Sequence, residues 1–180
     1  MTGREAAPRR DQMVDLLAGL SHRVAAATAG INASQAAYRY GPAFPTIREV
    51  VEHLRADSQV SDAALRRVCV ETDPEVDLRI ELEPGRPAAS IEDLIEDISR
   101  YRRRTVDMLR NLRREEWLRS AQLRQVGPAS LGELCQMIAL HGAGHVSQLH
   151  SLAALVPDEQ QIPGPSSPGQ APQAAVPSSD

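Results

Sequence analysis

Four stretches of this chain repeat apolar residues at intervals of three or four, the spacing that aligns side chains on one face of an α-helix. They cover about residues 13–40, 47–70, 91–114 and 131–156. The hydrophobic content of 42% consists mostly of aliphatic residues and alanine, because aromatic residues make up only 3%. A chain of 180 residues can bury one core of this kind. We therefore predict an all-α fold, a single four-helix bundle.

Three of these helices have a recognisable start. Each follows a Ser or Thr that has an acidic residue three positions later, which is the capping box that satisfies backbone N–H groups of the first turn. The pairs are Thr46 with Glu49, Ser90 with Asp93, and Ser130 with Glu133. Helices are thus predicted to begin at residues 47, 91 and 131, and prolines after Tyr40 end the first helix.

The connection between the second and third predicted helices is long. Apolar and charged residues alternate in it from Val76 to Glu83, and such alternation indicates extended chain. We predict a crossover segment that lays its apolar edge along the bundle and turns at Pro84 and Gly85. Pairing of this segment with the same segment of a second chain, in a homodimer, is the alternative.

The two ends of the chain differ in composition from the middle. Residues 1–11 are mostly polar and are expected to be flexible, and 12–156 form the predicted bundle. From Pro157 the chain consists largely of Pro, Ser, Gly, Gln and Ala, which bury too little apolar surface to offset the entropy of ordering. We predict that residues 157–180 are disordered.

Charge is unevenly distributed along the chain. Residues 71–97 contain ten acids and two arginines, whereas residues 100–124 contain nine arginines and three acids. The two runs are either solvated faces that attract each other or a place where arginines receive an anionic substrate. A net charge of −4 argues against nucleic acid as a partner, although binding through residues 100–124 is a third reading.

Cys69 and Cys135 are the only cysteines, and neither belongs to a CxxC pair. Both lie in helical patterns and are interpreted as small buried hydrophobic residues. This usage favours the reducing cytoplasm, and no stretch is apolar enough to suggest a membrane span.

The last predicted helix contains the sequence HGAGH. Its histidines, His141 and His145, are four residues apart and therefore share one helix face, where they could hold one divalent ion. Their spacing from Ile138 and Leu149 also places them on the predicted core-facing seam, where an unpartnered imidazole is costly. Metal sites in bundles use side chains from facing helices, so we expect a third ligand on another helix.

Three histidines lie outside this pair. The helical positions of His22 and His150 favour the surface. His53 lies on the same helix face as Asp57 and Val60. By spacing alone it is either a hydrogen-bonded core residue or a metal ligand.

Two segments of the chain resemble the DinB-like superfamily of metalloenzymes. They are TIREVVEHLRAD, which contains His53, and the stretch from Glu115 to Leu152. The shared features are a histidine on the second helix, Trp117, a Gly and Ser entry into the last helix, and HxxxH followed by Gln148 and Leu149. The resemblance covers residues 13–156 and implies a four-helix bundle with a long crossover. It also implies that His53, His141 and His145 bind one divalent metal, such as zinc or nickel.

The resemblance further implies a reaction class, because members of the superfamily include thiol-dependent transferases and isomerases. We expect a metal-dependent enzyme that transfers a low-molecular-weight thiol to an electrophilic small molecule in detoxification or stress response. Three imidazoles leave open positions on the ion, where the cation lowers the pKa of a thiol. Water in that place would make the protein a hydrolase. The alternative is a non-catalytic metal-binding or interaction module.

Two polar residues near the expected ligands have open roles. Asp57 and Gln148 are candidates for contacts behind the ligands or to substrate, and otherwise solvated helix residues. Within HGAGH, Gly142 and Gly144 weaken the helix, which suggests close packing or an approaching ligand.

Overall fold

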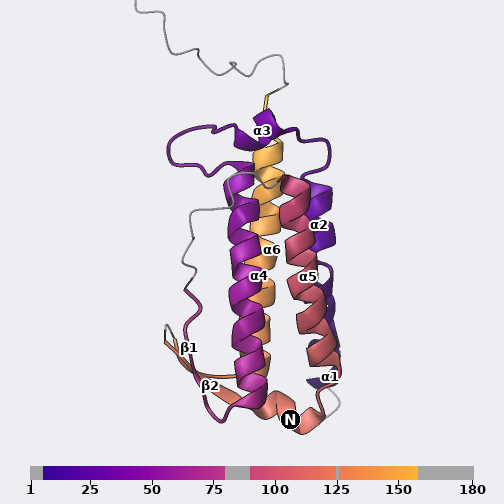
Figure 1. Cartoon of the computed structure of the whole chain (residues 1–180), viewed down its shortest axis with the longest axis vertical. Coiled ribbons are helices and arrows are strands. Elements are labelled where there is room, and N and C mark those ends of the chain that lie inside the picture. The colour runs from indigo at the N-terminus through magenta and orange to yellow at the C-terminus, as the bar shows by residue number, and fades with distance from the viewer. Residues whose placement is uncertain (1–5, 80–89, 125, 158–180) are drawn as a thin grey trace, which may run out of the picture.

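The computed structural model describes residues 6–79, 90–124 and 126–157. Within them, the predicted all-α class and four-helix bundle are confirmed (Figure 1). The helices are α1 (Ala6–Ala18), α2 (Leu20–Ala27), α3 (Ala33–Ala37), α4 (Ile47–Val70), α5 (Ile91–Arg110), a 3₁₀ helix (Arg114–Leu118) and α6 (Leu131–Ala153). None of the described helices is long and apolar enough to cross a membrane.

Four rods make up the bundle, and α1 and α2 together form one of them. Helix α4 packs against α5 and α6, and the rod of α1 and α2 packs against the same two helices (Figure 1). Side-chain contacts between α4 and α5 advance together along both helices: Arg55 with Asp97, Asp57 with Arg102, and Asp62 with Thr105. The two helices are therefore parallel, which requires the predicted long crossover between them.

All three predicted capping boxes are present. In each, the hydroxyl accepts from the third backbone N–H of the helix while the acid accepts from the N–H of the cap. Helices α4, α5 and α6 therefore begin at the predicted residues. Two of them end earlier than predicted: α5 stops at Arg110 instead of Arg114, and α6 at Ala153 instead of Val156.

The prediction of one helix over residues 13–40 is wrong, because three shorter helices occupy this part of the chain. The first break is at Gly19, where an added Cβ would lie 2.6 Å from Arg23 Nη1. Arg23 donates from Nη2 to the Leu16 carbonyl at this break. Gly30, with φ of +77°, forms the second. Residues 6–11 belong to α1, whereas residues 1–5 and 158–180 lie outside the described residues.

A small sheet at one end of the bundle was not predicted. Strand β1 (Glu75–Val76) pairs in parallel with β2 (Ser120–Leu123), and β2 pairs in antiparallel with β3 (Gly127–Ser130). The crossover therefore begins as the expected extended chain but has a strand partner. Residues 80–85, including the predicted turn at Pro84 and Gly85, lie outside the described residues.

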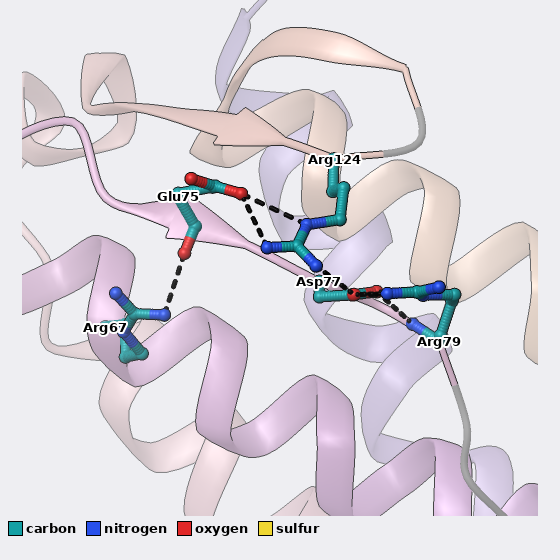
Figure 2. A network of polar contacts seen from close by, with 5 residues as sticks. All are labelled: Arg67, Glu75, Asp77, Arg79 and Arg124. Atoms are coloured by element: carbon teal, nitrogen blue, oxygen red, sulfur yellow. Dashed lines mark hydrogen bonds and ion pairs between the residues drawn. The ribbon is translucent and has the colours of Figure 1, made fainter.

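The charged residues around β1 hold it against the bundle (Figure 2). Arg124 donates from Nε and Nη2 to Glu75 Oε1, at 3.1 and 2.9 Å. On the edge that faces away from β2, the Glu75 carbonyl accepts a hydrogen bond of 2.8 Å from Arg67 Nη1. In this structure the strand partner of β1 is thus β2 of the same chain. The Glu75 carbonyl on the outer edge of β1 is hydrogen-bonded by the side chain of Arg67 and not by another strand.

The two glycines of HGAGH have different surroundings, and this difference predicts a difference in stability. An added Cβ at Gly142 would lie 3.2 and 3.3 Å from the two terminal methyl carbons of the buried Leu20, whereas one at Gly144 would meet nothing within 4 Å. We expect Gly144→Ala to raise the free energy of unfolding by about 0.5–1 kcal/mol, through helix propensity. The free energy of unfolding of Gly142→Ala should be about 1–3 kcal/mol lower than that of Gly144→Ala, because the added methyl group overpacks the core. Urea denaturation of the metal-free proteins measures both free energies of unfolding. Equal increases in the two variants would contradict the close contact between Gly142 and Leu20.

Candidate metal centre

The three histidines singled out from the sequence converge between two neighbouring helices. His53 comes from the second turn of α4, and His141 and His145 come from the middle of α6. One ring nitrogen of each lies within 4.8 Å of the others. His53 Nε2 lies 3.2 Å from His141 Nε2, and the ring of His145 has its centroid 4.5 Å from that of each partner. Parts of the chain 88 residues apart thus meet here.

The expected position of His141 and His145 on the core-facing seam is wrong. The buried line of α6 runs through Ile138, Gly142, Val146 and Leu149. His141 is exposed, and His145 and His53 are half-buried. A glycine at the core position carries no hydrophobic signal, so the apolar pattern pointed to its neighbour His141. The cluster therefore lies at the edge of the bundle, where solvent and small molecules reach it.

The donor set fits a divalent transition-metal ion. With metal–nitrogen distances of about 2.0–2.1 Å, tetrahedral geometry separates two ligand nitrogens by about 3.3 Å. The 3.2 Å between His53 Nε2 and His141 Nε2 matches this spacing. No two of the three candidate ligand nitrogens are more than 4.8 Å apart. Imidazole ligands suit zinc, nickel and copper, so the donor set does not by itself select among them.

Burial and the neighbouring histidines favour the neutral form of His53. Partial burial lowers the pKa of this imidazole, the positive forms of His145 and His141 lower it further, and Asp57 opposes the shift. Metal binding needs imidazoles without a proton on the ligating nitrogen, so this lowered pKa prepares His53 for binding.

The lowered pKa of His53 also predicts how stability depends on pH. The folded protein holds this proton more weakly than the unfolded chain, whose histidine titrates near 6.5. The neutral form of His53 therefore contributes its full stabilisation of the folded protein above pH 6.5. This contribution is lost as the pH falls from 6.5 through the lower pKa that His53 has in the folded protein. We expect metal-free His53→Gln to lose less stability than the unmutated protein between pH 7.5 and pH 5. Parallel urea unfolding curves check this, and identical losses would contradict it.

Gln148 is placed directly behind one of the candidate ligands. Its Oε1 lies 2.9 Å from His145 Nδ1, and the contact is partly buried. The sequence left Gln148 open between such a contact and a solvated helix position. The structure places it against His145.

Asp57 is not a solvated helix residue, and it is not part of the histidine cluster. It is buried, and its Oδ2 accepts a hydrogen bond of 2.7 Å from Arg102 Nη2. Ser61 donates to the other oxygen at 3.3 Å. The carboxylate is thus taken up by an ion pair between α4 and α5, one turn beyond His53.

The burial of Arg102 was not predicted from the sequence, because every reading of residues 100–124 left these arginines accessible to solvent, substrate or nucleic acid. Its side chain is only 1% exposed. Burial lowers the pKa of the guanidinium, and Asp57 opposes that shift. Its Nε and Nη1 have no hydrogen-bond partner within the described residues. Four residues after Ile98, Arg102 stands on the apolar stripe of α5, and that position was the available signal.

The remaining histidines and Cys135 are placed as predicted, whereas Cys69 is less buried than predicted. His22 and His150 are exposed. Cys135 is buried, and burial raises the pKa of its thiol to about 12. Burial also raises the pKa of the half-buried Cys69. Neither thiol belongs to the ligand cluster found among the described residues.

Some charges of the acidic run 71–97 pair with the arginine run 100–124. Arg124 contacts Glu75 at 2.9 Å and Asp77 at 3.5 Å. These pairs agree with the reading that the two runs attract each other. Exposed pairs of this kind contribute little to stability.

Comparison with known proteins agrees with this architecture. The family model of the DinB superfamily matches residues 10–149. The chain belongs to the DinB superfamily. A solved structure, YfiT from Bacillus subtilis, aligns with this DinB-superfamily chain at a TM-score of 0.74 and 16% identity, covering 86% of this chain and 90% of YfiT. YfiT is described as a probable metal-dependent hydrolase with an unusual four-helix bundle topology. At this identity the likeness shows the shared fold. Comparison with curated proteins gives no match.

Proposed function

We propose that this member of the DinB superfamily is a divalent-metal-dependent enzyme in which His53, His141 and His145 hold one ion. The observation that carries the proposal is the approach of their ring nitrogens to within 4.8 Å of one another, at an edge of the bundle open to solvent. The description of YfiT as a probable metal-dependent protein adds support from a shared fold.

A divalent cation held by three imidazoles keeps open coordination positions and lowers the pKa of a thiol or water molecule, which supplies a nucleophile at neutral pH. The residues of this chain position the ion and leave its outer side accessible. In this proposal the nucleophile comes from solution, since burial raises the thiol pKa of Cys69 and of Cys135 and neither belongs to the histidine cluster.

An exposed apolar side chain of α6 provides a surface for an electrophilic substrate. Met137 is 38% exposed and lies four residues before His141, so it shares the helix face of that histidine.

The nucleophile that we propose is a low-molecular-weight thiol, which the protein transfers to an electrophilic small molecule in detoxification or stress response. Such a reaction fits the cytoplasm, where thiols are kept reduced. Hydrolysis with water is the second candidate, and the similarity to YfiT favours it.

One experiment separates these functions. Protein loaded with zinc or nickel is incubated with electrophiles, with and without glutathione, bacillithiol or mycothiol, and thiol consumption and product formation are followed. Metal-dependent thiol consumption that His141→Ala abolishes supports transfer. Product formation in the absence of thiol would mean that the reaction is hydrolysis and not thiol transfer. Metal binding without any turnover would leave a non-catalytic metal-binding module, and absence of metal binding would overturn the proposal.

A further inference from the structure

The contact between His145 and Gln148 constrains how the imidazole can act. Gln148 Oε1 lies 2.9 Å from His145 Nδ1, and the two residues are three positions apart on α6. An amide oxygen only accepts hydrogen bonds, so Nδ1 has to carry the proton in this arrangement. A neutral imidazole has one such proton. Nε2 of His145 is then left with a free lone pair.

The other two imidazoles present the same atom to the cluster. His53 and His141 face each other through their Nε2 atoms, at 3.2 Å. The ring of His145 lies equally close to both, with centroid distances of 4.5 Å. Ligation through three Nε2 atoms therefore requires the Nδ1–H tautomer of His145. The opposite orientation of the Gln148 amide would donate to Nδ1 and place a proton on Nε2, which prevents ligation.

We propose that Gln148 is a positioning residue that holds His145 in the Nδ1–H tautomer and turns its Nε2 toward His53 and His141. The inference rests on the proposed metal site. Within the described residues, His145 is the one member of the cluster that makes a hydrogen bond to a side chain other than histidine. Its partial burial reduces competition from water for the Nδ1 proton.

The loss of such a partner has a known scale. Groups that bind the far nitrogen of a ligating histidine typically change metal affinity about 10-fold to 100-fold when they are removed. We expect Gln148→Ala to weaken zinc binding within this range. Gln148→Glu keeps an acceptor for Nδ1–H and is expected to retain or increase the affinity. Gln136→Ala, an exposed glutamine on the same helix, is the matched control and is expected to change nothing.

Two measurements test the proposal. Long-range ¹H–¹⁵N NMR of the metal-free protein at pH 8, above the ordinary titration range of histidine, reads the tautomer of each ring. We expect His145 to be in the Nδ1–H form and to become a tautomer mixture in Gln148→Ala. Competition titration with a zinc chelator then measures affinity in the four proteins. A protonated Nε2 in the unmutated protein, or an affinity of Gln148→Ala within about twofold of it, would overturn the role of Gln148.

The two readouts also separate this inference from the proposed function. If none of the four proteins binds zinc, nickel or another divalent ion, the proposed metal site fails. The tautomer of His145 still decides whether Gln148 orients the ring.

Discussion

Replacing His53 with alanine is expected to weaken zinc binding by more than about 100-fold, because even the loss of a group behind a ligand costs about 10-fold to 100-fold. The substitution leaves two nitrogens, both on α6, and removes the only ligand atom contributed by α4. The control is His150→Ala, which removes an exposed histidine of α6 and is expected to leave the affinity unchanged.

Thermal unfolding gives an independent readout of the same change. An ion that binds only the folded protein stabilises it by about 2.7 kcal/mol at a free concentration of 100 times Kd. The melting temperature of the unmutated protein and of His150→Ala should therefore rise with added zinc, whereas that of His53→Ala should not. Equal shifts in all three proteins would mean that zinc binds somewhere other than this cluster.

Arg102→Met is expected to lower the free energy of unfolding by about 3–5 kcal/mol, a large part of the stability of a small domain. The reason is that the carboxylate of Asp57, which accepts a 2.7 Å hydrogen bond from Arg102, would stay buried without its counter-charge. Urea unfolding followed by the fluorescence of Trp117, the single tryptophan, measures the loss. Arg110→Met is the control on the same helix. Its pair with Asp15 is exposed and long, at 3.6 Å, so its loss should cost less than about 1 kcal/mol.

The double variant Asp57→Leu with Arg102→Met distinguishes an unpaired charge from a damaged core. Replacing both members of a buried ion pair with apolar residues is often neutral or stabilising. The double variant should therefore recover most of the stability that Arg102→Met loses. If it is as unstable as the single variant, the loss comes from packing around α5 and not from the charge of Asp57.

Much of the bundle could be predicted because its signals are local. The capping boxes at Thr46, Ser90 and Ser130 act within one helical turn, so they place the starts of α4, α5 and α6 without knowledge of the fold. The sheet was not predicted for two reasons. Strands β2 and β3 have four residues each, too few for an alternating pattern to be recognised, and β1 pairs with a strand that is distant in the sequence.

The candidate site was predictable only in part. The pair His141 and His145 is visible as a spacing on one helix, whereas the approach of His53 depends on the packing of α4 against α6 and came from the family resemblance. The buried state of Arg102 and the core position of Gly142 were hidden because their residue types carry the opposite signal. The burial of a charged residue or of a glycine on a helix can be recognised only when the positions of the neighbouring helices are known.

The location of a bound ion can be measured directly from anomalous X-ray scattering by crystals of the protein grown with zinc or nickel. We predict a single strong peak at about 2.0–2.1 Å from one ring nitrogen each of His53, His141 and His145. A peak elsewhere, or none between α4 and α6 at saturating metal, would contradict the assignment of these three histidines as the metal site.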